Sequence, residues 1–203
     1  MMDNLSLVQR VVIWILPIVF ALTVHEFAHG WMARRYGDNT AYMLGRLTLN
    51  PIKHIDWLGT VLLPGILMLS GTHFIFGWAK PVPVNSRNFK NPRQDMAIVA
   101  LAGPVSNLLM ALAWALLARI GVVVGIESIS LPFIYSGMAG ISINLGLMVL
   151  NMLPIPPLDG SRVVSGLLSP KLAWRYNQLE QYGFIILIEI GRASCRERVS
   201  SPV

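Results

Sequence analysis

The sequence predicts an all-α protein that crosses a membrane several times. Of its 203 residues, 54% are hydrophobic and 13% are charged, whereas soluble domains carry about 25% charged residues. The hydrophobic residues are collected in long runs, and basic residues lie in the short segments between them. Long apolar runs flanked by basic residues are typical of membrane-spanning helices. These observations predict one membrane-embedded domain over residues 1–188 with a core of three helices.

Three apolar runs are long enough to form the core. They cover residues 11–32, 96–118 and 131–153, and each would span a hydrocarbon layer of about 30 Å at a helical rise of about 1.5 Å per residue. The basic residues indicate orientation, because cytoplasmic loops are enriched in Lys and Arg. We therefore expect the first helix to end in the cytoplasm, the second core helix to lead out and the third to return.

A further apolar run, residues 57–76, is interrupted by Gly59, Pro64, Gly65 and Gly71. The loops on both sides of it are basic, so both are expected on the cytoplasmic side. A re-entrant segment that dips into the membrane and returns satisfies both observations, provided that protein or a water-filled cavity covers its backbone. An ordinary spanning helix stays open as the alternative, since the charge rule has exceptions.

Two segments between the apolar runs suit short β-strands near the core. Residues 41–50 carry spaced Leu and Thr, and in residues 80–85 Pro81 and Pro83 alternate with Val82 and Val84. Alternation with Pro is typical of an edge strand or an extended segment. An edge strand of this kind could pair with an unfolded peptide. A covered loop is the alternative prediction.

The C-terminal end departs from the apolar pattern. Residues 182–188 are apolar but too few to span a membrane. From Glu189 the composition changes to Arg, Ser and Glu. We expect a truncated last helix, followed by a foreign or disordered polar tail over residues 189–203.

The net charge of +6 does not indicate a nucleic-acid partner. The basic residues flank apolar runs instead of forming one face, which is the pattern of membrane orientation. The expected surroundings are therefore the lipid bilayer. Cys195 is the single cysteine, so a cysteine-based zinc site is excluded and a metal would need His and carboxylate ligands.

The first apolar run contains the motif His25-Glu-Phe-Ala-His29. On a helix the two His side chains fall on one face and can share a zinc ion, with Glu26 beside them as a candidate general base. Glu26 is the only acid in residues 11–32, and an ionisable group at the bilayer centre costs about 2.5–3.5 kcal/mol on insertion scales. That cost favours a metal site over the alternatives, helix packing or proton relay.

A hydrolytic zinc site needs a third protein ligand and one open position. Asp159 is a candidate because it follows the last core helix, where Pro154, Pro156 and Pro157 end regular helix and let the chain bend back. By the charge argument, that helix end lies on the same side of the membrane as His25 and His29.

Five sequence motifs occur in a characteristic order. HEFAHG, GRLTLNPIKHID, FGWAKPVPVN, AGPVSN and NMLPIPPLDG follow one another between His25 and Gly160, and the resemblance that they carry covers residues 8–188. Together they resemble the site-2 protease family of intramembrane zinc metalloproteases, in particular its short bacterial and archaeal branch without a PDZ domain. Trp57 stands where the family has Pro, which affects a local turn.

The resemblance implies a role for six residues. His25, His29 and Asp159 would bind one Zn²⁺ per chain, and Glu26 would activate the attacking water. Asn151 and Asn107 would orient the substrate or stabilise the oxyanion. For Asn107 a polar contact between helices is the alternative, and His54 and His73 are expected to make polar contacts outside the site.

The resemblance also implies the activity, which is cleavage of transmembrane segments of membrane proteins in a prokaryotic cell membrane. His25 lies 14 residues after Val11, hence about 21 Å into a core of about 30 Å, nearer the cytoplasmic face. The alternative function is a metal-binding or metal-transport protein that uses the same His pair without hydrolysis. A non-catalytic relative is disfavoured because the four catalytic positions are present.

Overall fold

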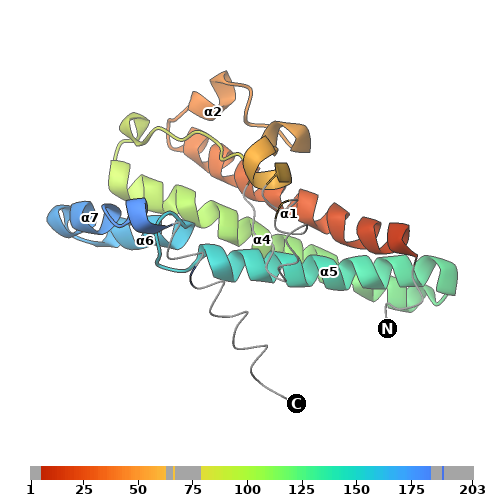
Figure 1. Cartoon of the computed structure of the whole chain (residues 1–203). Helices are drawn as coiled ribbons and strands as arrows, with labels where there is room; N and C mark the ends of the chain where they lie inside the picture. Colours follow the sequence, from red (N-terminus) through yellow and green to blue (C-terminus); the bar gives the residue numbers. More distant parts are fainter. Residues whose placement is uncertain (1–5, 63–65, 67–78, 184–188, 190–203) are drawn as a thin grey trace, which may run out of the picture.

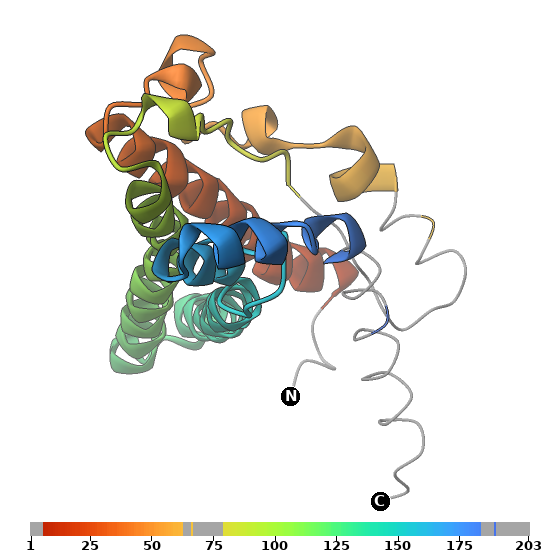
Figure 2. The same ribbon diagram turned by 90° about the vertical axis from the view of Figure 1, so that its left-hand side faces the viewer.

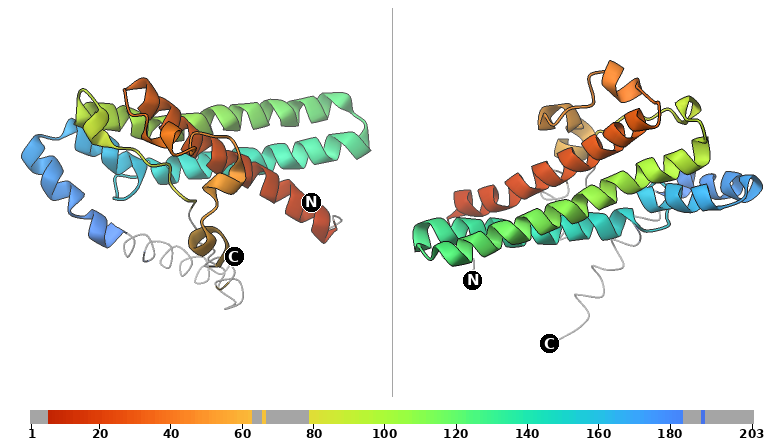
Figure 3. Two further views of the ribbon diagram at one scale, coloured as in Figure 1. Left: turned by 90° about the horizontal axis from the view of Figure 1, so that it is seen from above. Right: turned by 180° about the vertical axis from the view of Figure 1, so that it is seen from behind.

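A computed structural model describes residues 6–62, 66, 79–183 and 189 of the chain. Within these ranges the protein is helical and contains no β-strand. Three long helices form its body: α1 (Leu7–Arg35), α4 (Pro92–Val124) and α5 (Glu127–Asn151). Figure 1 shows α4 and α5 side by side, with α1 packed against both. Figure 3 shows α1 crossing this pair at an angle.

The three long helices match the predicted core. Stretches long and apolar enough to cross a membrane cover Val11–Arg35, Pro92–Val124 and Ser130–Asn151, the described residues containing three such helices. Many of their apolar side chains are exposed, for example Leu109 at 62% and Leu116 at 63%. Apolar exposure on this scale suits helices surrounded by lipid. The prediction of an all-α, multi-pass membrane protein is confirmed.

Local sequence explains where two of the long helices begin. Ser6 and Gln9 form a reciprocal capping box at the start of α1, which satisfies amide groups that the first turn leaves without partners. At the start of α4, Pro92 occupies the first turn and the Asp95 carboxylate accepts a hydrogen bond from the Asn91 backbone N–H at 2.9 Å. Pro is tolerated there because its missing N–H has no helical partner.

The prediction of short strands is wrong, and a loop takes their place. Residues 41–50 contain the short helix α2 (Thr40–Met43) followed by turns, and residues 80–85 are extended without a strand partner. Pro81 and Pro83 have no backbone N–H, so a regular ladder of hydrogen bonds cannot form. The two segments are linked instead by the Arg46 side chain, whose Nη2 donates to the Lys80 carbonyl at 3.0 Å.

The predicted re-entrant segment lies largely outside the described residues. Its beginning forms a short π-helix, η2 (Trp57–Leu62), after the 3₁₀ turn η1 (Pro51–His54). Figure 2 shows both on the α1 side of the molecule, away from α5. Re-entry of residues 57–76 stays a prediction, and so do the truncated last helix and the polar tail, since residues 184–188 and 190–203 are not described.

Beyond α5 the chain turns back toward α4. A proline-containing turn leads into α6 (Asp159–Leu167) and then α7 (Pro170–Asn177), and α6 packs against α4. The turn is tight: a Cβ atom on Gly160 would lie 2.6 Å from the Leu153 carbonyl oxygen and nearer still to that of Met152. Only glycine allows this close approach. The first turn of α6, with Asp159, is thereby brought against the bundle.

Candidate metal centre

The two histidines of α1 face each other across one helical turn. Their ring centroids are 4.6 Å apart with an interplanar angle of 87°, and their Nε2 atoms are 3.0 Å apart. His25 is buried and His29 is half-buried. The spacing of four residues places both rings on the same side of the helix, as the sequence predicts.

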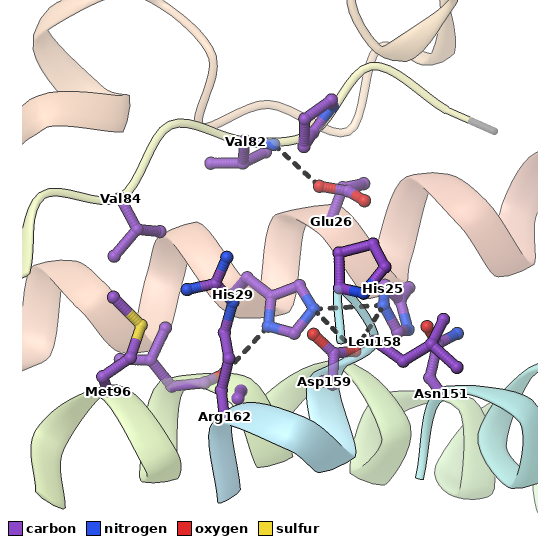
Figure 4. A pocket seen from close by; sticks show the side chains of 14 residues that line it. His25, Glu26, His29, Val82, Val84, Met96, Asn151, Leu158, Asp159 and Arg162 are labelled. Carbon is purple, nitrogen blue, oxygen red and sulfur yellow. Dashed lines mark hydrogen bonds and ion pairs between the residues drawn. The ribbon is translucent and has the colours of Figure 1, made fainter. Parts of the chain in front are cut away.

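The carboxylate of Asp159 meets both rings (Figure 4). Its Oδ2 atom is 3.2 Å from Nε2 of His25 and 3.3 Å from Nε2 of His29. The three side chains each offer one ligand atom, and these atoms lie within 4.8 Å of one another. The structure thus brings together the three residues that the sequence nominates as metal ligands.

The hydrogen bonds at the Nδ1 atoms decide whether the Nε2 atoms are donors or acceptors. Nδ1 of His29 is 2.8 Å from the carbonyl oxygen of Val99, which can only accept, so this nitrogen is the donor. Nδ1 of His25 is 2.5 Å from Oδ1 of Asn107, whose amide nitrogen donates elsewhere. In a neutral imidazole the other nitrogen then carries a lone pair. Both Nε2 atoms are therefore acceptors when the rings are neutral.

With both rings neutral, as metal binding requires, three acceptor atoms converge here. Asp159 Oδ2 is buried and finds no hydrogen-bond donor among the described residues. A buried, unsatisfied carboxylate oxygen facing two imidazole lone pairs is unfavourable unless a cation lies between them. Two nitrogens and one oxygen are a ligand set that zinc uses in catalytic sites, with the fourth position open. The residues present therefore fit zinc.

Gly103 of α4 provides room for the imidazole rings. A Cβ atom at this position would lie 2.5 Å from Cε1 of His25 and 2.6 Å from Cε1 of His29, and would also clash with the His29 Nε2 atom. Any side chain here would displace the rings. The glycine of the AGPVSN segment thus has a direct structural role at the metal centre.

Glu26 lies beside the histidines and reaches the extended segment of residues 79–85. Its Oε2 atom accepts a hydrogen bond from the Val82 backbone N–H at 2.8 Å. Figure 4 shows this segment passing over α1 above the two rings. The carboxylate is therefore held at the edge of the centre and is not one of the three converging ligand atoms.

Asp38 anchors the same segment to the end of α1. Its fully buried carboxylate accepts from the Asn85 backbone N–H and the Asn88 side-chain amide, both at 2.7 Å, and from the backbone and hydroxyl of Thr40. Burial alone would raise the pKa of Asp38, but these hydrogen bonds to the ionised form outweigh it and the pKa is lowered. The segment over the centre is fixed through one ionised side chain.

A cavity of about 380 Å³ opens beside the ligands. Its lining includes Glu26, the proposed metal ligands and Asn151, together with an apolar side made by Val84, Met96, Val99 and Ala100. Asn151 lies at the end of α5, where its amide nitrogen donates to the Leu147 carbonyl at 3.0 Å. A cavity with an apolar wall and a few polar groups is typical of a ligand site.

Arg162 also lines the cavity, although it is not among the site residues expected from the sequence. Its guanidinium is 3.7 Å from the Glu180 carboxylate, and both side chains are about half exposed. A weak signal was present in the sequence, because Arg162 follows Asp159 by three residues and so shares its helix face.

The remaining predicted residues have other contacts. Asn107 is fully buried and bonds to His25 behind the metal centre, a different contact from the expected one with substrate. His54 is 3% exposed and its Nε2 atom bonds to the Thr48 carbonyl at 2.8 Å, a polar contact outside the site. His73 lies outside the described residues.

Comparison with known proteins gives a consistent answer. The family model of peptidase family M50 matches residues 13–130. "Putative zinc metalloprotease YwhC" of Bacillus subtilis (strain 168) is 42% identical over 179 residues, which are 86% of this chain and 77% of that protein. "Putative zinc metalloprotease Rip2" of Mycolicibacterium smegmatis is 31% identical over 92% of this chain and 70% of its own length.

A more distant relative is "Regulator of sigma-E protease RseP" of Salmonella typhimurium. It is 32% identical over 58% of this chain, which corresponds to 27% of its own length. No solved structure matches the chain. The family match covers more than half of the chain and agrees with the ligand set of the centre. The chain therefore belongs to peptidase family M50, the site-2 protease family of zinc metalloproteases.

Proposed function

We propose that this metalloprotease hydrolyses peptide bonds within transmembrane segments of other membrane proteins. The observation that carries the proposal is the position of the metal centre. His25 lies ten residues before Arg35, the end of α1, and therefore about 15 Å from that end at a rise of about 1.5 Å per residue. Because α1 is long and apolar enough to span a membrane, this depth supports a substrate that is cut within the bilayer.

Each residue has a proposed role. His25, His29 and Asp159 would hold one zinc ion, which supplies Lewis-acid polarisation of the peptide carbonyl and an acidic water. Glu26, adjacent to His25, would accept a proton from the attacking water and pass it to the leaving amine. Asn151, whose side chain lines the cavity, would orient the substrate backbone.

The substrate has to be extended at the cleavage point. A membrane helix hides its carbonyl groups in internal hydrogen bonds, so the residues around the cleaved bond have to leave the helix before water can reach the carbonyl. We therefore expect helix-breaking Gly or Pro near the cleavage point to favour hydrolysis. The apolar wall of the cavity supports an apolar side chain next to the cut bond.

The active site is proposed to open toward the cytoplasm of a prokaryotic cell. The C-terminal end of α1 carries Arg34 and Arg35, and the end of the bundle where α6 and α7 lie carries Arg162, Lys171 and Arg175. Basic residues concentrate on the cytoplasmic side of membrane proteins. This distribution supports the sidedness.

The decisive experiment compares the purified protein with its Glu26→Gln variant. A model transmembrane substrate in detergent or nanodiscs should be cleaved by the original protein and spared when a zinc chelator is present. Glu26→Gln should abolish cleavage while zinc stays at about one equivalent, because the base is lost and the ligands remain. Glu180→Gln, which neutralises an exposed carboxylate outside the cavity, is the matched control and should cleave normally.

Two results would contradict the proposal. If the original protein and Glu26→Gln cleave equally well, Glu26 is not the general base, and the motif has no hydrolytic role. Zinc movement into sealed vesicles without any cleavage would favour the metal-transport alternative, which needs ligands but no base beside an open position.

A further inference from the structure

Behind the metal centre, three buried polar side chains connect the three long helices. His25 of α1 contacts Asn107 of α4, and Asn107 contacts Asn144 of α5. Asn107 and Asn144 are fully buried. Asn144 is absent from the motifs that carry the family resemblance, and it lies outside contact with the proposed ligands.

The direction of each hydrogen bond in this series follows from the contact that Asn144 makes at its end. The amide nitrogen of Asn144 donates to the Gly140 carbonyl at 2.8 Å, and a carbonyl can only accept. Asn144 Oδ1 is thus the acceptor for the Asn107 amide nitrogen at 3.0 Å. Asn107 must then present Oδ1 to Nδ1 of His25, which donates at 2.5 Å. Reversing any one amide would set two donors or two acceptors against each other.

Two asparagines inside adjacent membrane helices are unfavourable without partners. Side-chain hydrogen bonds between membrane helices on average add only weakly to helix association. Helix packing alone therefore does not explain why two linked asparagines are buried here. A metal-bound histidine, in contrast, usually depends on a partner at its second nitrogen, which sets the tautomer and the ring orientation.

We propose that Asn144 is a positioning residue of the metal centre, acting through Asn107 to fix the tautomer and ring orientation of His25. Without the Asn144 acceptor, the Asn107 amide is free to turn over and offer its NH₂ group to His25. The imidazole would then protonate Nε2, the atom that faces Asp159, or rotate. This inference rests on the metal centre of the proposed function, but it concerns metal binding and can be measured without a substrate.

The first test is metal affinity of the purified, metal-free protein in detergent or nanodiscs, using cobalt(II) as a spectroscopic probe and zinc in competition with a chelator. Asn144→Leu removes the acceptor while keeping the branching at Cγ and an apolar helix surface. We expect its zinc and cobalt affinities to fall by about 10- to 100-fold, as for other partners of metal-bound histidines. The cobalt absorption bands should also shift, since the ring orientation changes.

The matched control is Ser142→Ala. Ser142 lies two residues away on α5, and among the described residues its hydroxyl donates to the Met138 carbonyl of the same helix at 3.0 Å. Its loss removes a polar contact of similar kind without touching the chain to His25. Affinity and cobalt spectrum should remain those of the original protein, and the metal-free proteins should all melt at similar temperatures.

A double-mutant cycle tests whether Asn144 acts through Asn107. If it does, adding Asn144→Leu to Asn107→Leu should change the affinity by less than about threefold, because the path is already broken. Effects that multiply would overturn the proposal, and so would an Asn144→Leu protein with unchanged affinity and spectrum.

A second variant, Asn144→Asp, tests the proposal even if Asn144→Leu does not fold. Its carboxyl group retains an acceptor for Asn107 and, when protonated in this buried place, a donor for the Gly140 carbonyl. It should bind zinc within about threefold of the original protein, whereas a loss above about tenfold would contradict the proposed role. Lack of proteolysis with intact metal binding would count against the proposed function only.

Discussion

Replacement of Gly103 by Ala should damage the metal centre although it improves the helix. Gly103 is in the interior of α4, where Ala is more favourable than Gly by about 0.8–1.0 kcal/mol in helix propensity. The added methyl group, however, would lie 2.5 Å from Cε1 of His25 and 2.6 Å from Cε1 of His29. The local and the tertiary effects of the same methyl group are therefore opposite.

The size of the damage follows from these distances. Relaxed contacts between carbon atoms are about 3.5–4.0 Å, so the rings or α4 must move by about 1 Å. Zinc–ligand distances are kept within about 0.2 Å, and a misplacement of about 1 Å can cost about 100-fold in rate. We expect Gly103→Ala to lose about 100-fold in both zinc affinity and cleavage rate.

The assay is zinc affinity by chelator competition, followed by cleavage of the model substrate at saturating zinc. Gly146→Ala is the matched control, because a Cβ atom on Gly146 of α5 meets nothing within 4 Å among the described residues. That variant should bind zinc and cleave normally. The reasoning is refuted if Gly103→Ala folds and retains the zinc affinity of the original protein.

Three further predictions use other parts of the structure. Asp159→Ala should lower both zinc occupancy and cleavage, whereas Glu26→Gln should lower cleavage alone. If Asp159→Ala keeps full zinc occupancy and full turnover, another carboxylate is the third ligand. Because the pKa of Asp38 is lowered by folding, its contribution to stability is present above about pH 4 and is lost as the pH falls through the folded pKa. Asp38→Asn should flatten this acid dependence of unfolding, and an unchanged pH profile would exclude Asp38 as its source. Single cysteines at positions Asn39, Asn88 and Ser128 in a protein without its native cysteine test the sidedness in intact cells. An impermeant reagent should label the cysteine at Ser128 and leave those at Asn39 and Asn88 unlabelled. Labelling at Asn88 would show that residues 57–76 cross the membrane.

Features that depend on local sequence alone were predictable. The three core helices follow from uninterrupted apolar runs, and the structure extends the first from Met32 to Arg35 and begins another at Pro92. The shared face of His25 and His29 follows from the helical period. The strand prediction failed, because spaced Leu and Thr in residues 41–50 fit a short helix and turns as well as they fit a strand.

Contacts between distant segments were decided only by the tertiary structure. Asp159 was a candidate from its place after a proline-rich turn, but its distance from the histidines depends on how α6 packs against α4. The Val82 bond to Glu26 and the path from Asn144 through Asn107 to His25 have no local pattern at all. Hydrophobicity and helical period determine which face of a helix is apolar or carries a motif. The rotation and sliding of one helix against another are set by packing, and these decide which buried polar groups meet.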